Sequence, residues 1–380
     1  MNANNTPLTV EQALTFLLAQ ARPVGDTESV ETASALGRVL AAPLRATVNV
    51  PPLDNSAMDG YAVCAADLDP AGETRLPLAQ RIIAGGVGQP LARGTAARIF
   101  TGAAVPPGAD AVAMQEDCAP EEGAVVIRPA APVGENIRRT GEDIVIGATV
   151  LTEGTRLRPQ EMGVAASIGL AALPVFRRLR VAVFFTGNEI VMPGQPLAEG
   201  QIYNSNRAAL RGLLAGLGVD VIDLGIVPDG LEPTVAALRQ AAAQADVIIT
   251  SGGVSVGEED YVKAAVAQQG ALEMWKVNMK PGKPLAFGRI GGAFFLGLPG
   301  NPVSALVTFC LFVRPFLLRC QGAAAAALVT FPVAAAFDWP RAGKRREFLR
   351  AKLAQNTAEL YPRQGSGVLT SAAWADGLGE

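Results

Sequence analysis

Apolar runs and amphipathic stretches alternate along residues 179–320, and this alternation constrains the fold more than any other feature of the sequence. Each of four strand-like runs is followed by a stretch with helical spacing, which predicts a parallel sheet with helices on both faces. Ligands of such sheets bind beyond the carboxyl ends of the strands. The expected strands span residues 181–185, 219–225, 246–250 and 293–298, and the expected helices span residues 207–217, 233–244, 260–269 and 302–318.

At 380 residues, the chain is too long for one core, so further domains are expected. Thr9 and Gln12 form a capping-box pattern before an apolar helix face. Residues 46–147 carry short apolar runs split by Gly, Pro and Asp turns, which indicates an irregular β domain. The predicted fold class is multidomain α/β plus β, with a central doubly wound α/β domain. The expected domains are a split helical domain (8–45 and 148–178), an inserted β domain (46–147), the α/β domain (179–326) and a small C-terminal β domain (327–380).

The chain has no histidine, and this absence removes histidine general bases, Ser-His-Asp triads and His-ligated metals. Its cysteines form no CxxC pair, so they are interpreted as small buried hydrophobic residues. The net charge of −3 argues against a surface that coats nucleic acid. The four cysteines are Cys64, Cys118, Cys310 and Cys320.

A cytoplasmic protein without a membrane partner is expected. Residues 1–7 lack the cationic and apolar regions of a signal peptide. The most apolar run, residues 303–313, ends at Arg314 and is taken as too short to span a bilayer.

Two glycine-containing segments follow predicted strands and precede predicted helices. The first contains Ser251, Gly252 and Gly253, where glycine allows the backbone N–H groups to approach a phosphate. A plain strand-to-helix turn without a ligand is the alternative. The second segment runs over residues 298–304, where Asn301 and Pro302 suit the start of a helix, so that capping alone would also explain it.

Three lysines surround a Pro-Gly turn in residues 276–284. Lys276, Lys280 and Lys283 would clamp an anion if they point inward, and would otherwise be solvated surface groups.

Acidic residues lie on loops, several of them just after predicted strand ends. Each alone suits a turn or a cap. Together they suit Mg²⁺, which proteins hold through carboxylates, waters and substrate phosphates. The acids are Asp54, Asp59, Glu142, Asp143, Glu189, Asp229, Glu258, Glu259 and Asp260, with the Thr101 hydroxyl as a further polar group.

The chain resembles the molybdopterin molybdenumtransferase family, which is related to the E domain of gephyrin. Seven motifs carry the resemblance, in order between residues 51 and 307. They are PPLDNSAMDGYAV (51–63), IFTGAAVPPGADAV (99–112), RRTGEDI (138–144), TGNEI (186–190), SGGVSVGEEDYV (251–262), VNMKPGKP (277–284) and LPGNPVSALV (298–307).

The resemblance implies an α/β domain of the molybdopterin-binding type and an elongated homodimer. It places the active site between that domain and the β domain of the other subunit. There, molybdate, as substrate, displaces AMP from adenylylated molybdopterin with assistance from Mg²⁺. A molybdopterin adenylyltransferase and molybdoenzyme maturation factors are further expected partners.

The resemblance also assigns roles to individual residues. It implies catalytic roles for Asp59, Thr101, Asp143, Glu189 and Asp260, and metal binding by Glu189 and Asp229. The implied substrate-binding residues are Arg138, Asp229, Ser251, Gly252, Gly253, Lys276, Lys280, Lys283, Pro299, Gly300, Asn301, Ser304, Arg345 and Ser366.

The chain departs from the family pattern at two places. Asn188 stands where the family commonly has aspartate, so Glu189 is expected to be the more important metal ligand. The family's last domain usually continues beyond the region of residues 369–379, so an incomplete C-terminal domain with an exposed sheet edge is expected. The alternative functions are a molybdopterin adenylyltransferase-like enzyme and a dimeric scaffold of the gephyrin E type.

Overall fold

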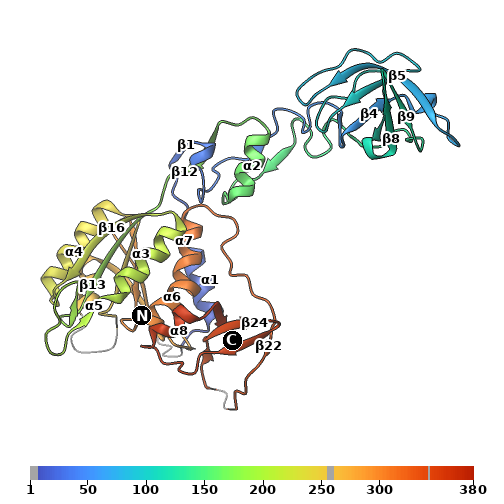
Figure 1. Cartoon of the computed structure of the whole chain (residues 1–380). Helices are drawn as coiled ribbons and strands as arrows, with labels where there is room; N and C mark the ends of the chain where they lie inside the picture. Colours follow the sequence, from blue (N-terminus) through green and yellow to red (C-terminus); the bar gives the residue numbers. More distant parts are fainter. Residues whose placement is uncertain (1–6, 255–260, 341–342) are drawn as a thin grey trace.

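The computed structural model describes residues 7–254, 261–340 and 343–380. The α/β and C-terminal parts form one end of an elongated molecule (Figure 1). A six-stranded β module, residues 60–127, forms the other end, and a small unit containing β1, β12 and α2 lies between them. The predicted fold class is confirmed.

The central sheet has six strands in the order β16-β13-β17-β21-β20-β18. The first four strands are parallel to one another, as predicted, and β20 runs antiparallel to both of its neighbours, β21 and β18. Ser251 pairs with both Phe185 and Leu298, so three strands end at one edge of the sheet. The strands are β13 (Arg180–Thr186), β16 (Asp220–Val227), β17 (Val247–Ser251), β18 (Gly270–Lys276), β20 (Pro284–Ile290) and β21 (Ala293–Leu298).

The sequence analysis did not predict β18 and β20. They form an antiparallel pair, and residues 277–283, called here the Lys-Pro-Gly segment, connect the two strands. The sequence analysis treated this segment as a separate anion clamp, although the strands on either side of it hold it in place.

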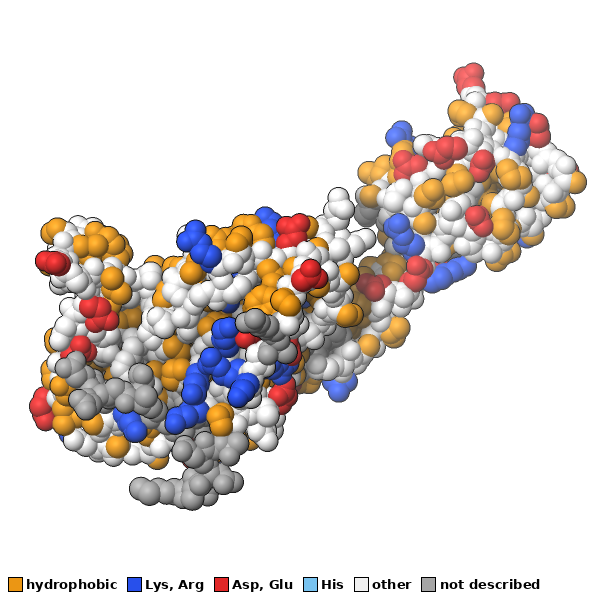
Figure 2. Space-filling view, turned by 90° about the horizontal axis from the view of Figure 1, so that it is seen from below, with side chains coloured by type: hydrophobic (Ala, Val, Ile, Leu, Met, Phe, Trp, Pro, Cys, Tyr) orange, Lys and Arg blue, Asp and Glu red, His pale blue; other side chains and the backbone are white. Residues whose placement is uncertain are grey.

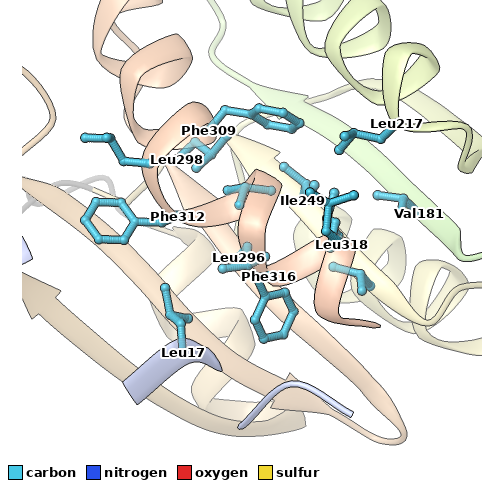
Figure 3. Packing of buried hydrophobic residues seen from close by; sticks show 14 of the residues in the cluster. Leu17, Val181, Leu217, Ile249, Leu296, Leu298, Phe309, Phe312, Phe316 and Leu318 are labelled. Atoms are coloured by element: carbon cyan, nitrogen blue, oxygen red, sulfur yellow. The ribbon is translucent and has the colours of Figure 1, made fainter. Parts of the chain in front are cut away.

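Alternate residues of the parallel strands face two hydrophobic layers. Val181 and Val183 belong to the layer that includes α1, α3, α6 and α7, whereas Ala182 and Phe184 face α4 and α5. Figure 3 shows buried residues of the first layer, including Leu17 of α1. The helices are α1 (Val10–Gln20), α3 (Ser205–Leu217), α4 (Leu231–Gln244), α5 (Tyr261–Gln269), α6 (Pro302–Thr308) and α7 (Arg314–Cys320).

The apolar run of residues 303–313 lies in a helix that continues past Arg314 and ends two residues beyond the predicted helix of residues 302–318. A π-helical turn, η4 (Phe309–Val313), joins α6 to α7 and gives a 19-residue helix, Pro302–Cys320. Its length and composition would suit a membrane span, but 78% of its most apolar window is buried inside the protein. Phe316 meets Phe287 and Phe294 edge-on at centroid distances of 5.6 and 5.1 Å, so this is a core helix of the α/β domain.

The first helix has the predicted capping box, because Thr9 and Gln12 exchange side-chain and backbone hydrogen bonds. It packs on the α/β sheet through Ala13 and Leu17, not on the split unit to which the sequence analysis assigned it. The unit between the two ends contains β1 (Thr27–Glu31), η1 (Thr32–Ser34), β2 (Leu44–Arg45), β11 (Thr149–Leu151), α2 (Pro159–Ser167) and β12 (Ala172–Phe176).

The β module folds around two small cores. Its sheet has the order β7-β4-β6-β5-β9-β8, in which only the β5–β6 pair is parallel. Its elements are β4 (Gly60–Val63), η2 (Ala65–Asp67), β5 (Thr74–Ile82), β6 (Ala96–Ile99), β7 (Ala111–Met114), η3 (Gln115–Asp117), β8 (Cys118–Glu121) and β9 (Ala124–Ile127), and β3 (Asn55–Ser56) pairs with β10 (Ile137–Arg138) beside it.

The C-terminal part has a four-stranded sheet in the order β22-β25-β24-β26. A parallel pairing of β19 with β23 attaches this part to the Lys-Pro-Gly segment of the α/β domain. The remaining elements are β14 (Ile190–Val191), β15 (Ile202–Tyr203), β19 (Met279–Lys280), β22 (Ala334–Ala335), β23 (Arg346–Glu347), β24 (Leu349–Ala354), β25 (Thr357–Leu360), α8 (Leu369–Trp374) and β26 (Gly377–Gly379).

Shortening Leu17 tests whether α1 is part of the α/β core. Because this side chain is fully buried, Leu17→Ala should lower the free energy of unfolding by about 2–5 kcal/mol. Urea denaturation followed by circular dichroism measures the change. Thr15→Ala, on the exposed side of the same helix, is the control. Equal stability of the two variants would show that α1 contributes nothing to the core.

Candidate functional site

A cavity of about 1030 Å³ lies at the carboxyl edge of the parallel strands. Thr186 and Ser251, the last residues of β13 and β17, line it together with the first turn of α3. The C-terminal part contributes Arg345 and the segment from Gln364 to Gly367. The predicted site residues that line the cavity are Glu189, Asp229, Ser251, Gly252, Gly253, Lys280, Lys283, Pro299, Gly300, Asn301, Ser304, Arg345 and Ser366.

The loop after β17 depends on glycine. Gly252 and Gly253 have φ values of 101° and 65°, which L residues rarely adopt. A Cβ on Gly252 would lie 2.7 Å from the Thr186 carbonyl oxygen, so a side chain there would force the strand ends apart. The Gly252 N–H donates to the Leu298 carbonyl at 3.1 Å, and this bond holds the loop against the end of β21.

The loop after β21 leads directly into α6. Asn301 occupies the N-cap position, and Pro302 follows it at the first helical position, as the sequence analysis expected. The Asn301 side chain makes no capping hydrogen bond within the described part of the chain, so capping does not explain this residue. Ser304, in the first turn, is buried and lines the cavity.

Among the described residues, three cationic side chains line the cavity. Lys280 and Lys283 come from the Lys-Pro-Gly segment, and Arg345 comes from the C-terminal part. Lys280 is half exposed and lies 3.2 Å from a carboxylate oxygen of Glu347. Figure 2 shows Lys and Arg side chains gathered on the α/β end of the molecule. Lys276, the last residue of β18, is exposed and does not line the cavity.

The turn between the two cavity lysines is tightly packed. Gly282 has a φ of 103°, and a Cβ there would lie 2.6 Å from the Thr308 hydroxyl oxygen of α6. The turn is therefore fixed against the same helix that carries Ser304.

Among the described residues, two carboxylates, Glu189 and Asp229, also line the cavity. Asp229 accepts the Asn188 backbone N–H at 2.8 Å, and its own N–H donates to the Asn188 side-chain oxygen at 3.3 Å. Asn188 thus holds the loop after β16 against the loop after β13. Asp260, with residues 255–259 of the predicted glycine loop, lies outside the described residues. In the part of the chain that the structure describes, no group of three or more acids or cysteines could hold a metal ion.

The C-terminal part is joined to the cavity by hydrogen bonds. The Val303 N–H donates to the Ser366 carbonyl at 3.0 Å. Arg350 is almost fully buried beneath this segment and donates to the Ser371 hydroxyl and to the carbonyls of Phe348 and Gly365. Burial lowers the pKa of Arg350 from its ordinary value.

Asp59, Thr101, Arg138 and Asp143 form a second group of predicted residues, in the β module or on the loops beside it (Figure 1). One carboxylate oxygen of Asp59 accepts both the backbone N–H and the hydroxyl of Thr101, each at 2.8 Å. The backbone bond is the larger cause that holds the pKa of Asp59 below its ordinary value. Arg138 is exposed at the end of β10, which pairs with β3, and Asp143 is exposed on the loop that follows, where its N–H donates to the Val50 carbonyl at 3.0 Å.

Asp54 links two loops of this second group, residues 51–59 and 138–143, through hydrogen bonds. Its carboxylate accepts the Thr140 N–H at 2.7 Å, the Thr140 hydroxyl at 2.9 Å and the Arg139 guanidinium at 2.7 Å. The backbone bond from Thr140 is the largest cause that lowers the pKa of Asp54. The loops of residues 51–59 and 138–143 therefore form one cluster, whereas the sequence analysis could treat them only as separate motifs.

The cysteines offer no nucleophile at this site. Burial raises the pKa of Cys118 to about 11 and that of Cys320 to about 12, and it also raises the pKa of Cys310. At neutral pH, these thiols are almost entirely protonated and therefore weakly nucleophilic. None of the four lines the cavity.

Sequence reasoning missed several cavity residues. Asn206 and Tyr203 flank the start of α3, and Gln364 precedes the Ser366 segment. The Asn204-Ser205-Asn206 run resembles an ordinary helix start, and nothing in its spacing marks Asn206 as part of a site. Only its three-dimensional neighbours distinguish it.

The fold and this cavity define the class: a multidomain protein whose α/β domain has a cavity lined by cations and glycine loops at its strand ends, joined to a distant β module with its own acidic cluster. Three family models match consecutive parts of the chain. They are the MoeA N-terminal region, domain I and II (residues 8–169), a probable molybdopterin binding domain (182–319) and the MoeA C-terminal region, domain IV (332–380).

Relatives with assigned names agree with these matches. A molybdopterin molybdenumtransferase of Haemophilus influenzae is 44% identical over 317 residues, which cover 83% of this chain and 78% of the relative. Molybdopterin molybdenumtransferase 2 of Mycobacterium tuberculosis is 41% identical, with 82% and 78% covered. A solved molybdopterin biosynthesis MoeA protein of Pyrococcus horikoshii has a TM-score of 0.81 at 30% identity and covers 97% of this chain and 94% of its own. The chain belongs to the molybdopterin molybdenumtransferase family and is an enzyme, which confirms the resemblance inferred from the seven motifs.

Removing the charge of Asp54 tests how the acidic cluster is held. Asp54→Asn should lower the free energy of unfolding at pH 7 by at most about 1 kcal/mol, because the group is partly exposed. The folded pKa is lowered below 3.8, so this stabilisation is present above that pH and is lost as the pH falls through the folded pKa. Melting temperatures of the two proteins should therefore converge in acid.

Glu122→Gln, an exposed change in the same β module, is the control for the general effect of removing a negative charge. A difference between wild type and Asp54→Asn that does not shrink as the pH is lowered progressively below 3.8 would contradict the assigned bonds.

Proposed function

We propose that this enzyme inserts molybdenum into adenylylated molybdopterin, with molybdate as the molybdenum source and AMP as the released product. The proposal depends mainly on the convergence of two glycine loops, three cations and the Ser366 segment in one cavity. The molybdopterin-binding family model and the names of the relatives support the substrate class.

The cationic side of the cavity suits molybdate, a tetrahedral dianion that requires several converging donors. Lys280, Lys283 and Arg345 supply positive charge, and the hydroxyls of Ser304 and Ser366 supply neutral donors. The two glycine loops, residues 251–253 and 299–301, suit the phosphates and pterin of the second substrate, since their backbone comes close to the ligand.

The two cavity carboxylates fit a magnesium ion. Mg²⁺ is usually held by one or two carboxylates together with substrate phosphates and waters. Glu189 and Asp229 would hold it, and Asn188 would act by positioning Asp229. When bound, the ion would neutralise charge on the phosphoanhydride that joins AMP to molybdopterin.

A second copy of the chain is needed to complete the site. Asp59, Thr101, Arg138 and Asp143 do not line the cavity, and they belong to the β module and the loops beside it, away from the α/β end of the chain (Figure 1). In a homodimer, the β-module cluster of one copy would close over the cavity of the other. We infer that binding and electrostatic stabilisation, not a protein nucleophile, carry the reaction, and the absence of histidine and the protonated state of the buried Cys320 are consistent with this.

The proposed reaction also implies partner proteins in the cytoplasm, one that makes the substrate and others that take up the product. A molybdopterin adenylyltransferase would supply the substrate, and molybdoenzyme maturation factors would receive the product. A function as an adenylyltransferase itself is disfavoured, because the N-terminal and C-terminal family regions extend well beyond the molybdopterin-binding domain. A purely scaffolding role would leave the convergence of cations on the cavity without a function.

Removing one cavity cation tests the proposed function. The measurement is molybdate- and Mg²⁺-dependent release of AMP from adenylylated molybdopterin. Lys280→Met should lower kcat/KM about 100-fold or more, because a charge facing a dianion is lost. Lys280→Arg should keep most of the activity. Lys352→Met removes a lysine elsewhere, on the C-terminal part beside Trp374, and should have no effect.

The possible results separate the alternatives. Substrate binding by the wild type without AMP release would contradict transfer. No binding at all would favour the scaffold.

Mixing two inactive variants tests whether the site is shared between copies. Asp59→Asn and Lys280→Met each damage both sites of a homodimer. Mixed dimers, formed by refolding the variants together, should regain one intact site. About one quarter of wild-type activity is expected, since half of the dimers would be mixed and each would carry one working site. No recovery, with dimers shown by light scattering, would place both groups in the site of a single copy.

A further inference from the structure

Asn206 connects the two glycine loops. Its side-chain nitrogen lies 2.8 Å from the Ser251 hydroxyl oxygen and 2.7 Å from the Gly300 carbonyl oxygen. Because a carbonyl can only accept, the atom that faces Gly300 must be the amide nitrogen, which fixes the orientation of this side chain. Both amide hydrogens are therefore used, one for each loop.

The loops are close enough for this link to set their separation. A Cβ placed on Gly300 would lie 3.8 Å from the Gly252 Cα, so the two backbones are in near contact. The Ser251 hydroxyl donates in turn to the Pro299 carbonyl at 3.0 Å. Asn206 thus begins a chain of hydrogen bonds that runs from α3 through the first loop to the second.

This network changes the role of Ser251. A serine hydroxyl has one proton, and that of Ser251 is committed to Pro299. Its oxygen already accepts from Asn206. While these bonds stand, Ser251 has no proton to donate to a phosphate oxygen, so its contribution is to hold the loops.

Asn206 itself projects from a firmly anchored helix. Leu210 and Leu214 of α3 are fully buried against the sheet. Asp223 of β16 binds both Arg207, at 2.7 Å, and Arg211, at 3.1 Å. The first turn of α3 is therefore a fixed point, from which one side chain reaches both loops.

We infer that Asn206 is a positioning residue, which sets the spacing of the two glycine loops around the anionic part of adenylylated molybdopterin. The inference rests on the proposed function, because it names the substrate of the same cavity. Molybdate would be held by Lys280, Lys283 and Arg345, which take no part in this hydrogen-bond network, so its binding should be insensitive to the spacing of the loops.

The test compares the affinities of the two substrates. Isothermal titration of adenylylated molybdopterin and of molybdate would be measured separately for wild type and Asn206→Ala. Loss of two hydrogen bonds between the loops should weaken binding of the pterin nucleotide at least tenfold. Molybdate affinity should change less than about twofold, and the melting temperature should stay within about 2 °C of wild type. Gln240→Ala, which removes an exposed amide on α4 outside the cavity, is the control.

Asn206→Asp provides a second variant with nearly the same shape. It replaces both donors by an acceptor that faces the Gly300 carbonyl, so nucleotide affinity should fall further than in Asn206→Ala at pH 8. Lowering the pH protonates the new carboxyl and returns one donor. Affinity relative to wild type should then recover, a response that a merely structural defect would not give.

Each outcome decides between the possibilities. Unchanged nucleotide affinity in both variants would overturn the inference and leave the proposed function intact. Equal weakening of both substrates, with a lowered melting temperature, would also overturn it and would assign Asn206 to general stability. Absence of nucleotide binding by the wild type would overturn the proposed function, and the inference with it.

Discussion

The shared register of β13, β17 and β21 is the constraint on which the rest of the site depends. Because Ser251 pairs with Phe185 on one side and Leu298 on the other, the chain leaves all three strands at the same level. The loops that follow these strands therefore all begin at the same edge of the sheet. They must turn back toward helices on the two faces of the sheet, and they do so around one cavity. Glycines at the turns and asparagines between them, Asn188 and Asn206, then fix the loops to one another.

The cationic side of the cavity depends on a second pairing. The antiparallel pair β18–β20 presents the Lys-Pro-Gly segment, and β19 within it pairs with β23 of the C-terminal part. Lys280 and Arg345 thus come from segments that a short ladder brings together. The buried Arg350 and its bonds to the Gly365 and Phe348 carbonyls hold the Ser366 segment against α6. The concentration of positive charge is therefore a product of tertiary structure, in a chain whose net charge is −3.

The sequence allowed the parallel strands, their helices and the capping box of α1 to be predicted, because each has a local period or cap that physics makes recognisable. It did not reveal β18 and β20, because these antiparallel strands are joined without the crossover helix that marks a parallel pair in the sequence. Nor did it place α1, since an amphipathic helix carries no information about which sheet it will cover. Asn206 was missed for a similar reason. An asparagine near a helix start resembles a cap, and only its contacts with Ser251 and Gly300 give it another role.

The two groups of predicted site residues are held independently of each other. In the cavity, Glu189 and Asp229 lie among the lining residues together with the lysines, and Lys280 pairs with Glu347. In the β-module cluster, Asp54 accepts from Arg139 and Thr140, and Asp59 accepts from Thr101. Each group therefore keeps its arrangement through local hydrogen bonds. In the homodimer proposed above, the two groups would meet in one site, where cations and carboxylates together would suit a phosphoanhydride with its metal ion.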